Sequence, residues 1–474
     1  MNIDRRNFLK ATGLTFSGAL LSACATNPNP TPPSPGTDGV LPNGYQFYSI
    51  KHNTDLLPGG IKGQTLRLDA AIDAHGRVLY GAMDSEDKIG LYALQLDLSG
   101  VTPRIHSENR IVRIGDVLDG RRVVELNNHD INAKGQLALV VRVETETNYN
   151  TTDEHGSFDG GTAPMKMQAI YCDLGQGLTR VLHEHVLNTD GHEFAGMFGD
   201  LNFHENDLIF VANYYHNTGQ VTKDVRQGVF SMRGLEGQNA SLVVTSGTSL
   251  AASTSAPVIS QFGLISLHDG GQFVLQAMLT PASEFANQYV EGKQQTAVLR
   301  GNLNTVSPAS RKTGSSSNLR VEASSISSGL RSSSSRASGL TCYAPRSGPN
   351  SSFAHVLNNG SQHALVVNNR VVMQSGDKAP TGNVVKAIAT PQLATDGITY
   401  FMVETSAGIE LLASNGSQSR TILKTGDLLV NHSSPVSDFI GVGYSAMHSD
   451  DEGRLVFVVI HEDDSQSLVL GLPV

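Results

Sequence analysis

The sequence contains no tryptophan and only three cysteines, and charged residues make up 16% of it. Several catalytic and cofactor patterns are also absent: Gly-x-Ser-x-Gly, a Gly-Lys-Ser/Thr phosphate loop, His-Glu-x-x-His and any Cys-x-x-Cys pair. The net charge of −10 at pH 7 argues against nucleic acid as a partner, because phosphates repel a negative protein. No cofactor is evident, and the sequence names no reaction. The informative features of the sequence are its N-terminal segment and its internal repeats.

Two of the cysteines, Cys172 and Cys342, lie well inside the chain. In an oxidising compartment they could form one disulfide. Two buried thiols in strands are an equally consistent alternative, because free cysteine behaves as a small apolar side chain.

The N-terminus combines positive charge, a short apolar run and a cysteine. It reads Asp4-Arg5-Arg6-Asn7-Phe8-Leu9-Lys10, and the apolar run ends in Leu21-Ser22-Ala23-Cys24. The 13 residues from 11 to 23 are fewer than the roughly 20 that span a bilayer. This order is typical of a cleavable signal. Arg5, Arg6, Phe8 and Leu9 resemble the twin-arginine export signal, and the segment ending at Cys24 resembles the lipobox of bacterial lipoproteins.

The resemblance implies export by the twin-arginine route, removal of residues 1–23 and lipidation of Cys24, which would anchor the protein to a membrane. Ala25 follows Cys24, which by resemblance to known sorting rules favours the outer over the inner membrane. Residues 24–42 are rich in proline and predict an extended tether. A folded domain is expected over 43–474.

A pattern of short apolar strands and turns recurs seven times in that domain. Clear copies are Asp69–Gly76 and Asp130–Gly135, each followed by a strongly apolar strand. A Gly-Asp pair ends three of the units, at 115–116, 376–377 and 426–427. Each unit predicts four strands, which in the second unit are 123–132, 136–143, 167–173 and 179–186. Four strands repeated seven times, without a helical apolar stripe, predict an all-β seven-bladed β-propeller.

The two ends of the domain complement each other. The last unit lacks a fourth strand, and the domain begins with an isolated strand at 45–50. We expect this strand to pair with 467–472 and complete the last blade, which removes a free edge. The repeat resembles those of TolB-like propellers and of bacterial surface propellers, which implies the fold and assigns no catalytic residue. The lack of tryptophan argues against a quinoprotein propeller, whose blades resemble one another in tryptophan docking motifs.

Two segments interrupt the repeat. Val306–Gly339 is rich in serine and basic, and Glu144–Gly161 is acidic. The basic segment could contact an acidic partner and the acidic one a cation, whereas the alternative is that both are solvated loops. A single strand is expected at Leu319–Ala323 inside the first segment.

Polar residues near the inner strands form the main candidate site. They come from different blades and could converge at the mouth of the propeller channel, where carboxylates and imidazoles could bind a divalent cation or perform acid–base chemistry. The alternative is that polar residues fill a wet channel. The candidates are Asp69, His129, Asp130, Asp200 and His448.

Histidines supply two further patterns. His183 and His185 would share one face of a strand and could bind a metal together, although an incidental pair on an outermost strand is the alternative. His75, His204 and His268 recur in turns, which predicts a structural hydrogen bond.

Taken together, these signals and repeats lead us to expect a membrane-anchored lipoprotein whose propeller binds a protein or glycan partner. The alternative is an extracytoplasmic hydrolase or lyase that uses the channel residues.

Overall fold

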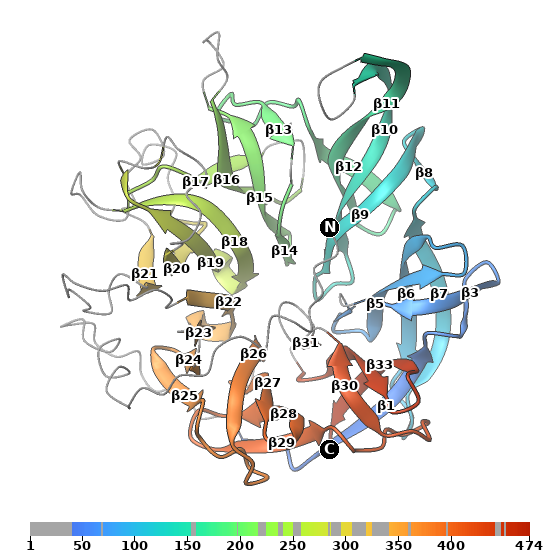
Figure 1. Ribbon diagram of the computed structural model, residues 1–474, viewed down its shortest axis with the longest axis vertical. Helices are drawn as coiled ribbons and strands as arrows, with labels where there is room; N and C mark the ends of the chain where they lie inside the picture. Colours follow the sequence, from blue (N-terminus) through green and yellow to red (C-terminus); the bar gives the residue numbers. More distant parts are fainter. Residues whose placement is uncertain are drawn as a thin grey trace.

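The chain forms seven antiparallel sheets around a common axis (Figure 1). The computed structural model describes residues 40–474 except 68–69, 153–157, 197, 217–223, 236–239, 250–256, 283–284, 286–294, 306–318, 325–340, 359–361, 395–396, 441–446 and 450–451. The predicted signal peptide, residues 1–23, and residues 24–39 lie outside the described residues. The prediction of an all-β, seven-bladed propeller is confirmed. Within the described part, no helix is long and apolar enough to cross a membrane.

Blades 1 to 3 follow one another along the chain. Blade 1 contains β2 (Leu56–Leu57), β3 (Ile61–Leu66), β4 (Ala71–Ile72), β5 (Arg77–Asp84), β6 (Ile89–Asp97) and β7 (Arg104–Arg113). Blade 2 contains β8 (Val117–Leu118), β9 (Arg121–Ile131), β10 (Leu137–Thr152), β11 (Phe158–Asp173) and β12 (Leu178–His183). Blade 3 contains β13 (Phe194–Gly196), β14 (Leu201–His204), β15 (Asp207–Tyr215), β16 (Val225–Arg233) and β17 (Ser241–Thr245).

Blades 4 to 6 each have four strands. Blade 4 contains β18 (Val258–His268), β19 (Gln272–Thr280), β20 (Gln295–Asn302) and β21 (Arg320–Ser324). Blade 5 contains β22 (Thr341–Ser347), β23 (Phe353–Asn358), β24 (His363–Val367) and β25 (Arg370–Gln374). Blade 6 contains β26 (Val385–Leu393), β27 (Thr399–Thr405), β28 (Gly408–Ser414) and β29 (Ser419–Lys424).

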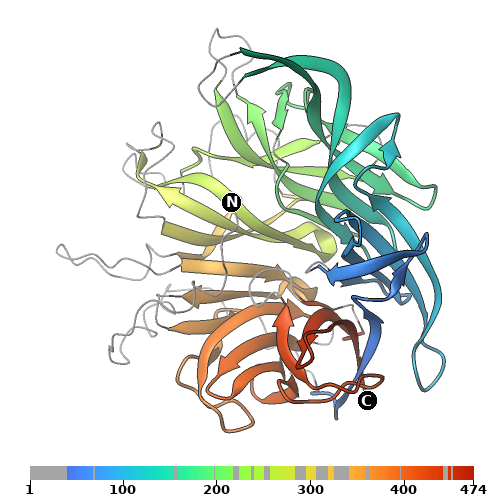
Figure 2. The ribbon, with the colours of Figure 1, turned by 45° about the vertical axis from the view of Figure 1, so that its right-hand side comes forward.

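Blade 7 joins the two ends of the domain. It contains β30 (Val436–Ile440), β31 (Met447–Ser449), β32 (Leu455–His461), β33 (Gln466–Pro473) and the N-terminal β1 (Tyr45–His52). β1 pairs antiparallel with β33 from Tyr45 opposite Pro473 to His52 opposite Ser467, as predicted. The blue N-terminal strand lies beside the red C-terminal strands in Figure 1 and again in Figure 2. This pairing closes the ring.

The outer edge of β1 is covered as well. Val430, in the connection between β29 and β30, forms a parallel bridge with Tyr48. Its backbone N–H donates to the carbonyl of Phe47 at 2.8 Å, and its carbonyl accepts from the N–H of Ser49 at 2.9 Å. An edge strand with free N–H and C=O groups invites pairing with another chain. Val430 therefore blocks part of that edge.

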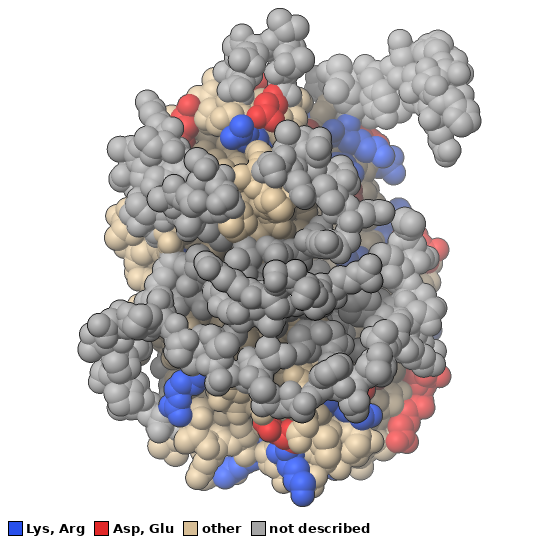
Figure 3. Space-filling view, turned by 60° about the vertical axis from the view of Figure 1, so that its left-hand side comes forward, with Lys and Arg blue, Asp and Glu red and all other residues tan. Residues whose placement is uncertain are grey.

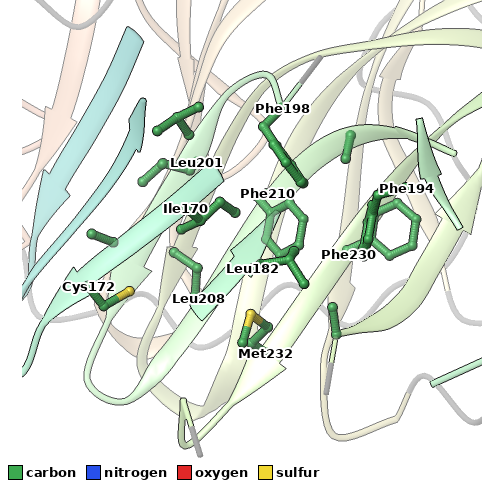
Figure 4. Packing of buried hydrophobic residues seen from close by; sticks show 14 of the residues in the cluster. Ile170, Cys172, Leu182, Phe194, Phe198, Leu201, Leu208, Phe210, Phe230 and Met232 are labelled. Carbon is green, nitrogen blue, oxygen red and sulfur yellow. The ribbon is translucent and has the colours of Figure 1, made fainter. Parts of the chain in front are cut away.

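The hydrophobic core consists of seven layers, one between each pair of neighbouring blades. Between blades 2 and 3 the layer is aromatic, because Phe194, Phe198, Phe210 and Phe230 pack against one another (Figure 4). Both faces of each sheet are thus buried, which explains the strongly apolar second strands. Burial of about 25 cal/mol per Å² of apolar surface makes these layers the main source of stability.

Polar bonds also tie each blade to the next. In four interfaces a side chain on the third strand of one blade accepts the backbone N–H of the inner strand, or of the segment leading into it, in the next blade. These bonds run from Phe198 N to Gln168 Oε1 (2.7 Å), Phe262 N to Gln227 Oε1 (2.5 Å), Cys342 N to Thr296 Oγ1 (2.6 Å) and Leu66 N to Gln466 Oε1 (2.7 Å). An inner strand has no neighbour on its axial edge, so such bonds satisfy groups that the ladder leaves free.

The recurring Gly-Asp pair links the outer strand of one blade to the inner strand of the next. Gly115 N donates to Val123 O, and Val123 N donates to Asp116 O, both at 2.8 Å. The carboxylate of Asp116 accepts the N–H of Arg113 at 2.9 Å. The same three bonds recur at the other two copies. Gly115 has φ +99°, a conformation that favours glycine.

The two interruptions differ from each other. Glu144–Gly161, expected to be a loop, is largely strand: β10 continues to Thr152 and β11 begins at Phe158. That prediction was wrong. β10 and β11 continue to pair with each other as a two-stranded ribbon, beyond the region where the other strands of blade 2 pair with them. In the Ser-rich segment, the expected strand at Leu319–Ala323 is β21 (Arg320–Ser324). The rest of that segment lies outside the described residues.

Candidate functional site

The seven inner strands place one residue from every blade at the same height around the propeller axis. Each position is identified by the residue that pairs with it on the second strand of the same blade. Asp130 pairs with Ala138 in blade 2, and Arg346 pairs with Ala354 in blade 5. We call the seven equivalent positions the inner ring. Its members are Ala71, Asp130, Asn202, Ser266, Arg346, Gln392 and His448.

Three side chains of the inner ring accept a hydrogen bond from the backbone of the following blade. In each case the donor is the N–H of the residue just after the next ring member. Three such bonds are Phe203 N to Asp130 Oδ2 at 2.8 Å, Leu267 N to Asn202 Oδ1 at 2.6 Å and Ser347 N to Ser266 Oγ at 3.0 Å. The ring thus has a repeated structural role in blades 2 to 5.

Two of the predicted site residues, Asp130 and Asp200, lie close together. Asn202 joins them, because its Nδ2 donates to Asp130 Oδ2 at 2.6 Å and Asp200 lies two residues earlier in the same segment. Asp200 Oδ2 accepts the N–H of Ile265 in the next blade at 2.7 Å. Arg346 faces this pair from blade 5, and its charge acts on both carboxylates. We call Asp130, Asp200, Asn202 and Arg346 the acid–arginine cluster.

The protonation of the cluster is set mainly by burial. The pKa of Asp130 is raised to about 7, chiefly because burial removes its carboxyl from water. Hydrogen bonds from two backbone N–H groups oppose this increase, and the charge of Asp200 adds to it. Burial likewise raises the pKa of Asp200 to about 6, against the bond from Ile265 and the charge of Arg346. Burial lowers the pKa of Arg346, and the two acids oppose this. Both acids therefore titrate near neutrality, where a general acid or base works best.

The other predicted site residues do not join this cluster among the described side chains. His129 is half-buried and alternates with Asp130 along β9, so its side chain projects to the opposite face of the blade. Asp69 lies outside the described residues. The backbone of His448 occupies its inner-ring position opposite Val456. The structure thus brings together two of the five candidates.

The sequence reasoning missed Asn202 and Arg346. A usable signal existed, because Ala71 and Asp130 each lie two residues before the Asp or Asn that begins the turn, Asp73 or Asn132. The same alignment does not find Asn202 or Arg346, because two residues after them the turns of blades 3 and 5 have His204 and Gly348 in place of Asp or Asn.

The histidine pair at 183 and 185 does not share a strand face, and that expectation was wrong. β12 ends at His183, and His185 has φ +67°. His185 N donates to Phe194 O at 2.9 Å, and Phe194 N donates to Val186 O at 3.0 Å. Gly115 and Asp116 make the equivalent bonds with Val123 between blades 1 and 2, so His185 takes the place of the glycine in the Gly-Asp link. β12 is the outermost strand of blade 2, as expected.

Asp and Asn side chains accept turn hydrogen bonds in blades 1 and 2. Asp73 Oδ1 accepts the N–H groups of His75 and Arg77 at 2.8 and 2.7 Å. The rings of His204 and His268 stack at 4.7 Å between blades 3 and 4. His75 lies inside its turn, whereas His204 and His268 end β14 and β18, so the three histidines do not occupy equivalent positions.

Potential metal ligands and thiols are dispersed. Within the described residues, no three His, Cys, Asp or Glu side chains lie where they could share a metal ion. Cys172 in blade 2 and Cys342 in blade 5 are both buried, and no disulfide joins them. Of the two alternatives for these cysteines, the structure shows the buried thiols.

Comparison with known proteins adds the following. No protein-family model and no curated protein sequence matches the chain. Among solved structures it is similar to a Trypanosoma rangeli sialidase mutant displaying trans-sialidase activity (10% identity, 90% of this chain, 58% of that chain, TM-score 0.36). It is also similar to the Dos1 propeller (9% identity, 89% of this chain, 83% of that chain, TM-score 0.35). A third similar structure is a Mycobacterium tuberculosis puromycin-hydrolyzing peptidase (11% identity, 91% of this chain, 54% of that chain, TM-score 0.47). The chain spans little more than half of the sialidase and the peptidase. The fold assignment rests on the seven sheets themselves.

Proposed function

We propose that this protein is an exported, lipid-anchored lipoprotein whose propeller binds a protein or glycan partner. One observation carries the proposal: both acids of the acid–arginine cluster are bonded to the neighbouring blade. Asp130 accepts the N–H groups of Ile131 and Phe203 and the amide of Asn202. A carboxylate that holds backbone donors has fewer lone pairs to offer a substrate. The cluster therefore supports a rigid scaffold more strongly than a catalytic centre.

The tether enters the propeller on one definable face. Neighbouring strands of a blade are antiparallel, so the first-to-second and third-to-fourth turns share one face, which we call the tether face. β1 is the fourth strand of blade 7, so residues 40–44 occupy the place of a third-to-fourth turn. Tyr45 OH donates to Gly453 O, in a first-to-second turn, at 2.7 Å. Lipidation at Cys24 would turn this face toward the membrane.

The opposite face, which we call the outer face, carries the second-to-third connections. In blade 2 this connection continues as the extended ribbon of β10 and β11. Nine residues separate β15 from β16 in blade 3, and fourteen separate β19 from β20 in blade 4. Connections held on a rigid scaffold are where binding residues concentrate. We therefore place the partner on the outer face over blades 2 to 4, away from the membrane.

The surface charge supports a protein or glycan partner. Among the described residues in Figure 3, lysines and arginines are interspersed with acids, and neither sign dominates this side. The net charge is −10. Nucleic acid binds through a continuous basic surface. A partner of mixed or low charge fits this arrangement better.

Photo-crosslinking in the native membrane tests the proposal. In the full-length protein, a photo-reactive residue would replace Val225, 38% exposed at the outer-face end of β16, or Leu174, 45% exposed on the tether face of blade 2. We expect a discrete crosslinked partner from Val225 and none from Leu174. Digestion of the product with protease or glycosidase identifies its class. Equal crosslinking at both positions, or at Leu174 alone, would contradict the proposed orientation.

A hydrolase or lyase is the second candidate, favoured by the near-neutral pKa values of Asp130 and Asp200 beside Arg346. In that case Asp130→Asn should abolish turnover of a glycan or peptide substrate and leave crosslinking from Val225 unchanged. Metal analysis of the purified protein adds a second test. A stoichiometric ion that is lost in Asp130→Ala would support the enzyme.

A further inference from the structure

Three histidine rings lie against one another where the propeller closes, and we call them the histidine stack. They are His52 of β1, His432 in the connection between β29 and β30, and His461 at the end of β32. The ring centroids of His432 and His461 lie 3.4 Å apart, and those of His52 and His432 lie 5.1 Å apart. His461 is fully buried, and the other two are half-buried. The stack lies at the outer-face end of blade 7, apart from the inner ring.

A directional chain of hydrogen bonds runs through His461. Ser49 of β1 donates its hydroxyl proton to Ser467 Oγ of β33 at 2.8 Å. Ser467 Oγ lies 2.8 Å from His461 Nε2, and His461 Nδ1 lies 2.9 Å from the carbonyl oxygen of Ser434. A carbonyl only accepts, so Nδ1 carries the ring proton and Nε2 accepts from Ser467. The chain therefore fits a neutral His461.

A second proton on His461 would disturb this arrangement. Nε2 would change from acceptor to donor, and a cation would occupy a fully buried position against the ring of His432. Burial lowers the pKa of His461 and the charge of His432 lowers it further, while the carbonyl of Ser434 and the charge of Asp463 raise it. An unfolded histidine binds its proton near pH 6.5. Stability at the seam is therefore lost as the pH falls below about 6.5.

The surrounding charges do not cancel this effect. Asp463, in the turn between β32 and β33, acts on both His432 and His461, but it is exposed and already bonded to Ser465. Exposed charges are weakened by solvent and salt. Three further charged groups around the seam already have hydrogen-bond or ion-pair partners. Asp55 accepts the backbone N–H of His52, Lys51 pairs with Glu108 of blade 1, and Asp427 pairs with Lys424. Glu462 and Asp464 are exposed in the same turn as Asp463.

We propose that His52, His432 and His461 form a pH-sensitive latch. The neutral imidazole of His461 holds β1 in blade 7, and its protonation at mildly acidic pH releases β1. The chain N-terminal to β1 is the predicted tether, so release would lengthen the tether by the length of this strand. The disc would open at its seam, while the six blades built from continuous chain remain paired. The latch does not depend on the nature of the partner or of the anchor.

Hydrogen exchange measured by mass spectrometry tests the latch in the full-length protein. Between pH 7.5 and 5.5, after correction for intrinsic exchange rates, we expect the opening of β1 and β33 to increase by up to about tenfold, because one proton is taken up on opening. Peptides from blades 3 and 6 should show no such increase. An unchanged β1, or an equal increase in all blades, would overturn the proposal without any variant.

Two matched variants sharpen the test. His461→Gln keeps an acceptor for Ser467 and a donor for Ser434 but cannot titrate, so the pH response of β1 should disappear. His106→Gln removes an exposed histidine on β7 and should leave the response intact. A seam that still opens at pH 5.5 in His461→Gln would show that other groups control it.

Discussion

Replacing Asp130 by asparagine should change how stability depends on pH. Burial raises the pKa of Asp130 from 3.8 to about 7 in the folded protein. Because the folded pKa is the higher one, the contribution of this group is fully present below about pH 4 and is lost as the pH rises through 7. Between pH 5 and pH 8 the loss is about 2 to 3 kcal/mol in the free energy of unfolding. Asparagine cannot titrate and lacks this dependence.

Urea denaturation at several pH values measures the effect. The chain has no tryptophan, so unfolding is best followed by far-ultraviolet circular dichroism. Asparagine offers one acceptor oxygen in place of two, so Asp130→Asn should be less stable by about 1 kcal/mol at pH 5. Toward pH 8 the difference should move by about 2 to 3 kcal/mol in favour of the variant. Asp87→Asn is the matched control, because Asp87 is exposed and its φ of +58° suits asparagine.

A difference between wild type and Asp130→Asn that stays constant from pH 5 to pH 8 would refute the reasoning. It would mean that the carboxyl of Asp130 is ionised throughout this range. The acid–arginine cluster would then be an ordinary set of charged hydrogen bonds, and the case for acid–base chemistry at the axis would lose its main support.

Other changes test other parts of the structure. Arg346→Gln removes the cation that acts on both acids, so it should lower stability by roughly 1 kcal/mol at pH 8 and less at pH 5, in the same titration. In Gly115→Ala the added methyl group meets no atom within 4 Å, but the residue must keep φ +99°. Backbone strain alone should therefore lower the free energy of unfolding by about 1 to 2 kcal/mol in thermal denaturation, whereas Gly100→Ala should be neutral. Deleting residues 1–52 should uncover β33 and cause oligomers in size-exclusion chromatography, and a monodisperse monomer would contradict this.

Much of the fold could be predicted because its signals are local. Short apolar runs separated by Gly, Asp and Asn mark strands and turns wherever they occur. Counting them gave seven units, and the strand missing after 467–472 matched the extra strand at Tyr45–Ile50. The ribbon at Glu144–Gly161 was missed because its polar sequence has no apolar alternation. Pairing with the facing strand, not burial, makes it a strand.

The site was less predictable because it depends on register between blades. Asp130 and Asp200 were found as polar residues near inner strands, but their link through Asn202 and the approach of Arg346 come from blades distant in sequence. The inner strands also contain irregular steps in pairing, which shift the count of positions along each blade. His185 was misplaced for a related reason. A residue with positive φ in the position of a glycine carries no mark in the sequence.

The acid–arginine cluster and the histidine latch respond to pH with opposite signs. Asp130 and Asp200 have raised pKa values, so their contribution grows as the pH falls from 8 to 5 and blades 2 to 4 hold together more firmly. His461 has a lowered pKa, so the seam in blade 7 loses stability over the acidic part of that range. A global denaturation curve adds the two effects and partly hides both. Acidification should therefore loosen the seam selectively within a disc that is otherwise stabilised, which is the behaviour required of a reversible latch.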